Sequence, residues 1–377
     1  MKERPRHAGR VIFIDLARAL AVVLMISGHT SSALLSTSYR SSEWFNVWQF
    51  QRGLTSALFL LLSGFAFSIA TSRHWPSHVN PSAAVVKRLR RFGLFVLLGY
   101  GLHFPVGHFS QLAEASDTQW RNFLAVDVLQ LIGVTFVLIQ LLVMVVRTRR
   151  MFTVAAFTLA AFLVVAAPAV WRTDWSGTLP LFLSSYLSSS TGSLFPIFPW
   201  AAFVLLGAGI GQLFAQWGTA SLRTFANWGM LLPGGVLVAV ASNMSIGPTG
   251  AAGVDDWSWI PGQLLLRSGI CLVILGIVAH ISHRIGQLPH VFGAVAQESL
   301  VVYFVHLCVV YGSVWNRGLH QSYGEALSLP VTLLFVAAVV VPMIALAWQW
   351  NNLKHTRPQA ARWVSIAVGT VLVVRLL

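Results

Sequence analysis

Long apolar runs, separated by short polar segments, are the dominant pattern of the chain. Apolar runs of roughly 17–25 residues are long enough for a helix to cross a hydrocarbon core about 30 Å thick. Eleven such runs are found at residues 11–36, 45–72, 84–104, 122–146, 151–171, 194–216, 225–243, 261–281, 291–315, 328–350 and 361–376. A helix satisfies its backbone hydrogen bonds internally, and the runs lack the period-two alternation of a membrane barrel. The sequence therefore predicts an all-α, polytopic transmembrane bundle of about eleven helices.

The composition supports this class of protein. Of 377 residues, 56% are apolar and only 10% are charged, and the mean hydropathy is +0.71. Ordinary soluble domains carry roughly a quarter charged residues, so a soluble enzyme, a disordered protein and a secreted disulfide scaffold are excluded. The two cysteines, Cys271 and Cys308, both lie inside apolar runs. No loop suggests a separate soluble domain, so residues 1–377 are expected to form one membrane domain.

The basic residues are distributed unequally between the two sides of the predicted bundle. If the amino terminus is cytoplasmic, 17 of the 25 Lys and Arg residues lie in cytoplasmic segments and five lie in outer segments. This bias follows the positive-inside rule. It predicts a cytoplasmic amino terminus and explains the net charge of +14 without nucleic acid. Asp15 and Arg18 interrupt the first run near its start, which favours a retained helix over a cleavable signal peptide.

Three ionisable residues lie within the first apolar run, namely Asp15, Arg18 and His29. Arg18 and His29 are eleven positions apart, which at about 100° per residue returns to the same helix face within roughly 20°. Asp15 deviates from the direction of His29 by about 40°. Ionisable residues inside a membrane span are costly and usually face the protein interior. The spacing predicts one polar stripe, with Arg18 towards the cytoplasm and His29 towards the outer boundary.

Each member of this stripe has a functional and a structural interpretation. Imidazole titrates near neutral pH, so His29 is a candidate general base or transient nucleophile. The alternative is a histidine that hydrogen-bonds a neighbouring carbonyl at the membrane edge. Asp15 and Arg18 are spaced i,i+3, which suits a structural ion pair in which Asp15 orients Arg18. Both interpretations can hold together.

The spacing of Arg18 and His29, with ten residues between them, resembles the Arg-x10-His motif of the acyltransferase 3 superfamily of membrane acyltransferases. Residues 13–20 are similar to the first-helix signature of this superfamily, and residues 58–65 are similar to its second-helix signature. The resemblance extends from about residue 10 to residue 310, with the motifs in the family's order.

Further motifs narrow this resemblance. Arg88 and Arg91, at the cytoplasmic start of the third run, match the Arg-x-x-Arg motif of the superfamily. Residues 127–133, 195–201 and 299–306 resemble the branch that includes heparan-alpha-glucosaminide N-acetyltransferase and its bacterial relatives. Each motif alone is short, but the ordered set is fairly specific.

Two features depart from the family pattern. The usual Arg-Gly after the first-helix Asp is Arg18-Ala19 in this chain. In parts of the N-acetyltransferase branch the proposed catalytic histidine lies in the following outer loop, but residues 37–46 contain no histidine. The assignment of the catalytic role to His29 therefore follows the wider superfamily.

The resemblance implies a membrane-embedded acyltransferase. It would move an acyl group, in particular acetyl, from cytoplasmic acyl-CoA to a hydroxyl or amine of a sugar-containing or other acceptor on the periplasmic side. Arg18, Arg88 and Arg91 would hold the donor, and His29 would take a proton from the acceptor or carry the acyl group transiently. The implied partners are membrane lipid, acyl-CoA and a carbohydrate or glycolipid acceptor, with a homodimer left open. The implied location is a bacterial inner membrane.

Arg88 and Arg91 also have a simpler explanation. A planar guanidinium suits the phosphates of acyl-CoA. Basic residues at the cytoplasmic start of a span also anchor it by the positive-inside rule, with or without anionic lipid. The sequence leaves both roles open.

Asp127, near the outer start of the fourth run, is the second candidate catalytic residue. A carboxylate beside an imidazole fixes its tautomer and stabilises the imidazolium formed by proton transfer. Asp127 is therefore expected to orient His29. Pairing with Arg267 or Arg52, both in or near outer segments, is the alternative.

Three further residues are candidates for acceptor binding. Trp200 suits stacking on a sugar, although an aromatic belt at the interface also explains it. Glu298 and His306 are eight positions apart, which places them about 80° from a common helix face. They need not act together. The alternative role for both is a hydrogen bond between helices. His103 and His108 have no further ligand at metal spacing, so no metal site is predicted.

Two functions other than acyl transfer are compatible with these residues. Asp15, Arg18, Asp127, Glu298 and His306 would also suit the proton relay of a transporter or exporter of a glycan or lipid-linked substrate. A catalytically inactive sensor or assembly protein is the third hypothesis. Consumption of acetyl-CoA would distinguish the enzyme from both.

Overall fold

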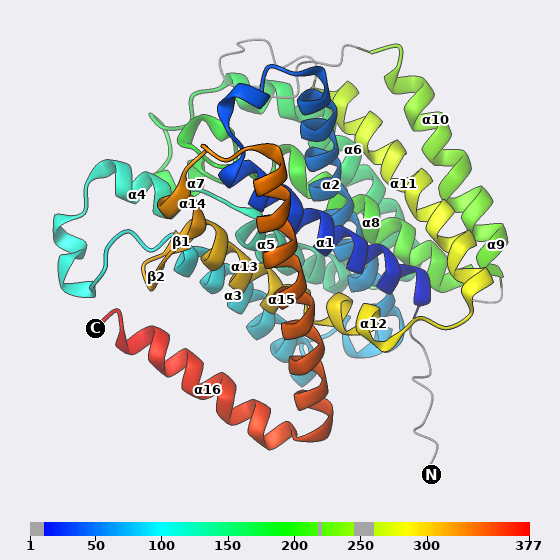
Figure 1. Cartoon of the computed structure of the whole chain (residues 1–377). Coiled ribbons are helices and arrows are strands. Elements are labelled where there is room, and N and C mark those ends of the chain that lie inside the picture. Colours follow the sequence, from blue (N-terminus) through cyan, green and yellow to red (C-terminus); the bar gives the residue numbers. More distant parts are fainter. Residues whose placement is uncertain (1–10, 218–220, 245–259) are drawn as a thin grey trace.

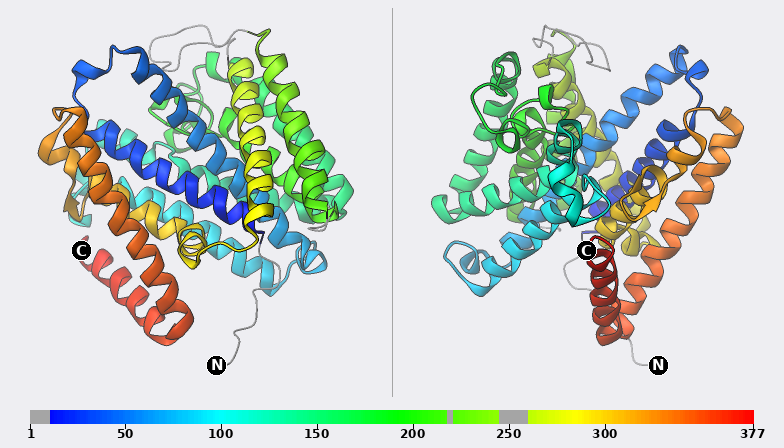
Figure 2. Two further views of the ribbon diagram at one scale, coloured as in Figure 1. Left: turned by 45° about the vertical axis from the view of Figure 1, so that its right-hand side comes forward. Right: turned by 90° about the vertical axis from the view of Figure 1, so that its left-hand side faces the viewer.

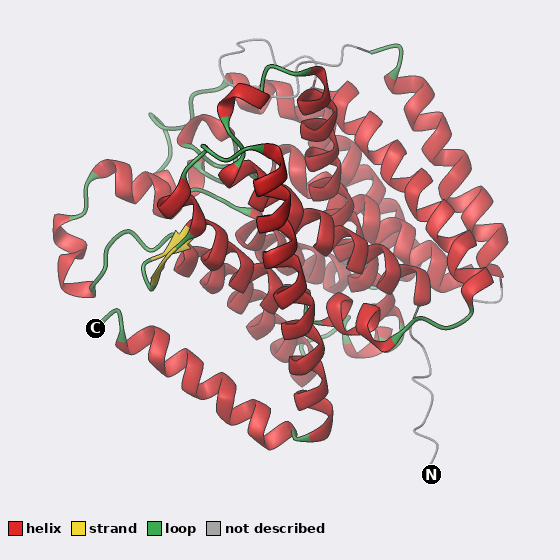
Figure 3. Cartoon of the chain, in the orientation of Figure 1, coloured by secondary structure: helices red, strands yellow, loops and turns green. Residues whose placement is uncertain are grey.

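The computed structural model describes residues 11–217, 221–244 and 260–377, and the remaining residues are drawn as a grey trace in Figure 1. Helices make up most of the described chain (Figure 3). The strands among these residues form one short antiparallel hairpin of β1 (Gly312–Ser313) and β2 (Asn316–Arg317). The all-α prediction is confirmed.

Eight helical segments are long and apolar enough to cross a membrane. They are α1 (Ile12–Leu34), α2 (Glu43–Ser72), α5 (Val128–Val146), α6 (Arg149–Arg172), α8 (Ile197–Trp217), the joined α9–α10 segment (Leu222–Ala241), α11 (Ile260–Ile285) and α15 (Leu329–Thr356). A ninth is present if α12 (His290–Gln297) and α13 (Ser299–Tyr311), which are bent by 73°, form one span. The predicted polytopic bundle is confirmed.

Two of the eleven predicted runs form helices that are less suited to crossing lipid. The helix α3 (Ala83–Leu102) carries four basic residues in its first half, and α16 (Pro358–Val374) is shorter than the eight spans above. The prediction of a cytoplasmic amino terminus rests partly on the first ten residues, which lie outside the described part of the chain. That orientation stays a prediction.

The other described helices are short and lie in the connections. They are η1 (Thr37–Tyr39), η2 (Trp75–Ser77), η3 (Phe109–Glu114), α4 (Asp117–Leu124), α7 (Leu181–Ser184), η4 (Ser189–Thr191) and α14 (Leu319–Tyr323). Within the seventh run, a π-helical segment, η6 (Ala226–Leu231), separates α9 (Leu222–Phe225) from α10 (Leu232–Ala241).

Two predicted runs are interrupted where polar residues cap or break a helix. The run at 122–146 is divided between α4 and α5, because Asp127 is the N-cap of α5 and its Oδ1 accepts a hydrogen bond from the Val128 amide at 2.7 Å. The run at 291–315 breaks at Glu298 and ends at Tyr311, where Gly312 adopts φ 83° and opens the hairpin. Both interruptions place polar side chains at helix ends inside the bundle.

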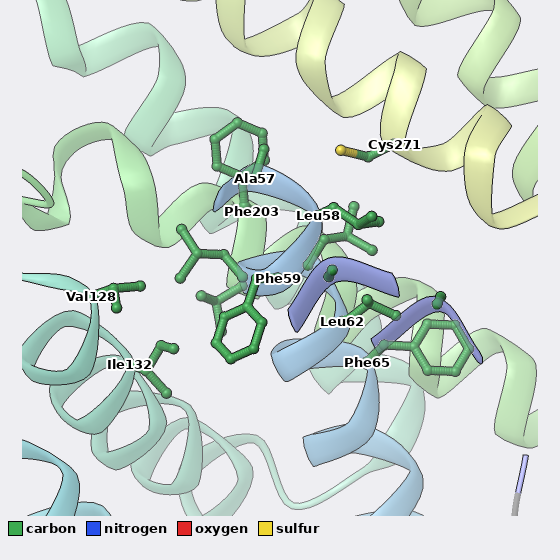
Figure 4. Packing of buried hydrophobic residues seen from close by; sticks show 14 of the residues in the cluster. Ala57, Leu58, Phe59, Leu62, Phe65, Val128, Ile132, Phe203 and Cys271 are labelled. Atoms are coloured by element: carbon green, nitrogen blue, oxygen red, sulfur yellow. The ribbon is translucent and has the colours of Figure 1, made fainter. Parts of the chain in front are cut away.

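The tightest packing in the bundle is between α2 and α8. A Cβ on Gly64 or on Gly207 would overlap the backbone of the facing helix, so these two positions require glycine. Small residues allow such close approach of membrane helices. The Ser68 hydroxyl also donates to the Ala208 carbonyl at 2.6 Å. Figure 4 shows the apolar side chains that surround this contact, including Phe203 of α8.

The polar residues of α1 lie between other helices. This helix packs against α2, α11, α12, α13 and α15, and Figure 2 shows it running obliquely through the molecule between α2 and α13. On one side Arg18 reaches the Leu62 carbonyl of α2, and near the other end His29 reaches the Tyr311 hydroxyl of α13. The predicted stripe therefore faces protein at both ends.

The close approach of α2 and α8 gives a direct test of the fold. We expect Gly207→Val to lower the free energy of unfolding by about 1–3 kcal/mol or more, because overpacking forces the two backbones apart. Gly93→Ala is the control, since nothing lies within 4 Å of a Cβ at Gly93 and alanine is the better helix former. Thermal unfolding of the purified protein in detergent measures both. Equal melting temperatures for Gly207→Val and the wild type would contradict this packing.

Candidate functional site

His29 lies in the second half of α1, towards Leu34, and its imidazole faces α13. Its Nδ1 is 3.2 Å from the Tyr311 hydroxyl, and its ring centroid is 5.3 Å from that of His306. The Tyr311 hydroxyl also donates to the backbone carbonyl of His29 at 3.4 Å. Because a hydroxyl has one proton, this arrangement is satisfied when Nδ1–H of His29 donates to Tyr311. Nε2 of His29 then carries the lone pair that a base requires.

His306 is a second imidazole with a defined tautomer. It is fully buried, and its Nδ1 lies 2.9 Å from the Val302 carbonyl, which can only accept. The proton is therefore on Nδ1, and Nε2 carries a lone pair. Among the described residues no group hydrogen-bonds to this Nε2. The structure brings His29 and His306 together, although their sequence positions give no sign of it.

Asp127 connects this pair to the end of α3. Its Oδ2 accepts a hydrogen bond from the Tyr303 hydroxyl at 3.4 Å and lies 3.5 Å from Nε2 of His103. The Tyr303 ring in turn packs edge-on against His306, with the centroids 5.5 Å apart. Asp127 lies close enough for its charge to act on His29. Its hydrogen-bond partners are nevertheless Tyr303 and His103, neither of which was predicted for it.

At the other end of α1, Arg18 lies near Leu62 of α2 and near the charges of Asp15 and Arg91. Its Nη2 is 3.5 Å from the Leu62 carbonyl, and the charges of Asp15 and Arg91 both act on it. The side chain is partly exposed, so it is not sealed within the core. Asp15 is thus near enough to orient Arg18, as the i,i+3 spacing predicts.

Arg88 is held firmly, whereas Arg91 is exposed. The Nη1 of Arg88 donates to Thr71 Oγ1 at 2.8 Å and to Gln140 Oε1 at 3.4 Å, and the guanidinium lies over the Phe67 ring. Arg91 lies on the next turn of α3, close enough for its charge to act on Arg88. The structure therefore gathers three guanidinium groups, including that of Arg18, at one end of the bundle.

His78, in the loop between α2 and α3, lies near this cluster of guanidinium groups. Burial, together with the charges of Arg88 and His74, lowers the pKa of His78 to about 4. The His78 side chain is therefore neutral at pH 7. Burial is the largest cause of this shift, and the positive charge of Arg88 adds to it. Guanidinium groups gathered in this way suit an anionic ligand such as a phosphate.

Glu298 lies at the break between α12 and α13, away from the two imidazoles. Its carboxylate accepts hydrogen bonds from the Lys354 Nζ at 2.7 Å and from the Asn351 Nδ2 at 2.9 Å, both on α15. The carboxylate is 3% exposed, whereas the Lys354 side chain is 42% exposed. Glu298 is about 12 Å along the helix from His306. These contacts give Glu298 a bracing role at the bend.

Trp200 lies near the start of α8, beside Arg267, which is 7% exposed. Its ring packs on Phe195 with the centroids 4.8 Å apart, and the Arg267 guanidinium lies 6.0 Å from the ring. The backbone amide of Phe195 donates to the Val126 carbonyl at 2.9 Å, next to Asp127. Trp200 is therefore on the same side of the bundle as the Asp127 carboxylate.

Tyr311 is the site residue that the sequence analysis missed. It is five positions after His306, which is about 140° around a helix, so no periodic pattern points to it. His103 was considered only as a metal ligand, but it lies against Asp127. Among the residues that the structure describes, no group of three or more His, Cys, Asp or Glu gathers at a metal-binding distance.

These observations define a polytopic, all-helical membrane protein with a buried histidine–tyrosine–aspartate cluster near one end and a guanidinium cluster near the other. A family model described as heparan-alpha-glucosaminide N-acetyltransferase, catalytic, matches residues 10–240. The chain belongs to this family, which confirms the predicted resemblance and identifies the protein as a membrane acetyltransferase. In a sequence search, no curated protein matches the chain. The matched range includes His29 and Asp127 but ends before α11 and α13.

The ion pair at the bend gives a test of the role of Glu298. We expect Lys354→Met to lower the free energy of unfolding by about 1–3 kcal/mol, because the buried carboxylate loses a partner. Adding Glu298→Gln should recover part of this loss, since the amide carries no charge to compensate. Thermal unfolding in detergent measures both, with Lys87→Met, an exposed cation of α3, as the control. A Lys354→Met variant as stable as the control would argue against a bracing role.

Proposed function

We propose that the protein transfers an acetyl group from acetyl-CoA to a hydroxyl or amine of a sugar-containing acceptor, with His29 as the catalytic residue. The observation that carries this proposal is the position of His29. Its ring faces α13 rather than lipid, is partly exposed, and has its Nδ1 occupied by Tyr311. Nε2 is then available for chemistry. The Arg18–His29 spacing within the matched family range supports the same assignment.

The reaction can follow either of two routes from this geometry. In direct transfer, the acceptor hydroxyl or amine gives its proton to Nε2 of His29 and attacks the thioester carbonyl, and the carbon–sulfur bond breaks. The CoA thiolate then takes the proton back from the imidazolium. In the two-step route, Nε2 itself attacks the carbonyl, the carbon–sulfur bond breaks and CoA leaves as the thiolate. The acceptor hydroxyl or amine then attacks the acetyl carbonyl, the bond from Nε2 to the carbonyl carbon breaks, and the proton of the acceptor goes to the CoA thiolate. Tyr311 fixes the tautomer in both routes.

Asp127 acts as a positioning and electrostatic residue in this proposal. Its negative charge favours the imidazolium that forms during proton transfer. Because its hydrogen bonds go to Tyr303 and His103, it holds α13 in place and thereby holds His306 against His29. Its charge acts on His29 through space, whereas its positioning effect on His29 is indirect.

Arg18, Arg88 and Arg91 are the proposed binding residues for the phosphates of acetyl-CoA. Guanidinium groups bind phosphate oxygens in a planar, bidentate manner. Arg18 and His29 are separated by about 17 Å along α1. A donor held at the guanidinium cluster would therefore reach His29 with its extended arm, from the cytoplasmic side that the positive-inside bias predicts. No metal is required by this scheme.

The acceptor would approach from the opposite, periplasmic side. Trp200 offers an aromatic face for a sugar ring, next to the Asp127 side of the cluster. Membrane lipid surrounds the bundle, and a glycolipid acceptor would enter laterally. A bacterial inner membrane and a homodimer are part of this proposal and are supported by the resemblance alone.

A proton-coupled transporter of a glycan or lipid-linked substrate is the second candidate. The specific observation in its favour is the row of titratable groups from His103 through Asp127, Tyr303 and His306 to His29. Such rows carry protons in transporters. Purified protein in liposomes separates the two, since a transporter gives proton-dependent uptake without release of CoA.

The catalytic assignment predicts a large effect at His29. We expect His29→Ala to reduce transfer of radiolabel from acetyl-CoA to a membrane glycan extract by about 10²–10⁴-fold, because the reaction loses its base or nucleophile. His283→Ala is the matched control, as His283 is exposed near the end of α11. Both variants must insert and remain monodisperse in detergent. Full turnover by a correctly inserted His29→Ala protein would assign the base to another residue.

The donor assignment predicts a selective effect at Arg88. We expect Arg88→Ala to raise the KM for acetyl-CoA by about 10-fold or more, because hydrogen bonds to charged groups contribute about 1.5–3 kcal/mol. The KM for the acceptor should stay the same. Arg150→Ala, which removes an exposed cation at the start of α6, is the control. An unchanged KM together with an altered dependence on anionic lipid would instead support the membrane-anchor role.

A further inference from the structure

The proposed acetyl transfer places a negative charge on an oxygen atom beside His29. In either route the nucleophile attacks the acetyl carbonyl carbon, and an electron pair of the carbon–oxygen double bond moves onto the oxygen. The tetrahedral adduct collapses when the carbon–sulfur bond breaks and CoA leaves as the thiolate. Enzymes stabilise such an oxyanion with N–H or O–H donors that are already fixed in place. The site therefore needs a proton donor or a cation beside the imidazole.

The three neighbours of His29 described above have no proton to offer to this oxygen. The Tyr311 hydroxyl donates its proton to the His29 carbonyl. His306 donates its Nδ1–H to the Val302 carbonyl and keeps a lone pair on Nε2. Asp127 is a carboxylate that accepts hydrogen bonds, so its charge opposes that of an oxyanion. A different residue has to supply the stabilising group.

Arg52 of α2 is a fourth neighbour of His29, and it is a cation. Its side chain crosses α1 at Gly28, the residue before His29. A Cβ on Gly28 would lie 3.3 Å from Cγ of Arg52 and 3.8 Å from its Nε. The charge of Arg52 acts on both His29 and Tyr311. Glycine at position 28 thus leaves room for an arginine side chain beside the proposed catalytic imidazole.

The N–H groups of Arg52 are not used by the protein. The ion pairs of the described ranges do not include Arg52, and among the described residues its guanidinium has no hydrogen-bond partner. The guanidinium lies 5.1 Å from the ring of Trp48, one turn earlier on α2, and this contact holds it on one side. By contrast, Arg40, whose charge acts on Arg52, is paired with Glu325 at 2.7 Å. The Arg52 side chain is partly exposed, so a ligand can reach its donors.

We propose that Arg52 is a second catalytic residue, whose guanidinium donates hydrogen bonds to the acetyl oxygen as this oxygen becomes negatively charged. A guanidinium stays protonated and offers several N–H donors, so Arg52 balances the charge without releasing or accepting a proton. The proton of the acceptor moves to the CoA thiolate as in the two routes above. This inference rests on the proposed acetyl transfer, but the contact that it describes is measurable without turnover.

The first test separates binding of the donor from the chemical step. We expect Arg52→Ala to lower kcat for acetyl transfer by about 10²–10³-fold, as removal of an oxyanion donor does in other enzymes. The KM for acetyl-CoA should stay the same, because the contact is made only in the transition state. Arg121→Ala, which removes an exposed cation of α4, is the control. An unchanged kcat in Arg52→Ala would overturn the proposal.

A second measurement distinguishes this role from a structural one. Guanidinium ion added to Arg52→Ala should restore part of the turnover, because the free cation can occupy the space of the missing side chain. Sodium chloride at the same concentration should not, and neither ion should restore His29→Ala. A melting temperature of Arg52→Ala far below that of the wild type, without any rescue by guanidinium, would show a structural role and overturn the proposal.

The close approach at Gly28 provides a milder variant. In Gly28→Ala the new methyl group lies 3.3 Å from Cγ of Arg52, so the arginine has to move by a few tenths of an ångström. We expect kcat to fall by about 3–10-fold, since a larger misplacement of about 1 Å costs about 100-fold. Gly93→Ala, where nothing lies within 4 Å of the Cβ, is the control. Equal kcat values for the two variants would contradict the placement of Arg52 at the reacting carbonyl.

A binding measurement tests the same contact without turnover. Carboxymethyl-CoA and carbamidomethyl-CoA have similar shapes at the sulfur, but the first ends in a carboxylate and the second in a neutral amide. We expect the wild type to bind the carboxylate analogue more tightly by about 10-fold or more. The preference should be lost in Arg52→Ala and persist in His29→Ala and Arg121→Ala. An equal preference in Arg52→Ala, or none in the wild type, would overturn the proposal.

These measurements keep the two proposals separable. If the wild type distinguishes the two analogues through Arg52 but releases no CoA from acetyl-CoA, the proposed transfer fails and the assigned contact of Arg52 stands. If the wild type transfers acetyl groups and Arg52→Ala does so at the same rate, the transfer stands and the role of Arg52 fails.

Discussion

The structure depends on one constraint: lipid offers no hydrogen-bond partner to a polar side chain. A polar group in the bundle is therefore stabilised only by a partner within the protein. α1 shows the result most clearly. It carries Arg18 and His29 on one face, and the helices around it bring a carbonyl to the first and a tyrosine hydroxyl to the second. The close packing of α2 against α8 forms the rigid side of this arrangement, because glycines let the two backbones meet.

The same constraint explains why helices break where they do. Asp127 ends the link between α4 and α5 and caps the latter, and Glu298 lies at the bend between α12 and α13. Each carboxylate is satisfied at a helix end, where backbone and side-chain donors are available. The bend at Glu298, braced by Lys354, sets the direction of α13. α13 in turn presents Tyr303, His306 and Tyr311 to the other polar groups.

Polar groups that lack protein partners are the informative exceptions in such a bundle. Among the described residues, His306 Nε2 and Arg267 Nε have no hydrogen-bond partner. The ring of His306 lies beside that of His29, and the guanidinium of Arg267 lies beside Trp200. A membrane protein that retains such groups gives up stability for them. Their positions bracket the path proposed for the acceptor, from the aromatic face of Trp200 to His29, the base proposed on α1. The cationic cluster around Arg88, the proposed binding site of the donor, lies at the other end of the same bundle.

The sequence by itself determined the membrane class, the helical fold, the family and the polar face of α1. These follow from run length, charge bias and residue spacing along one helix, all of which are local properties. Only the tertiary structure decided the partners across helices, because hydrogen bonds between α1, α5 and α13 join residues more than a hundred positions apart. Asp127 therefore bonds Tyr303 and His103 rather than Arg52 or Arg267, and Glu298 bonds Lys354. No periodicity within one helix encodes which side chain a second helix will bring to it.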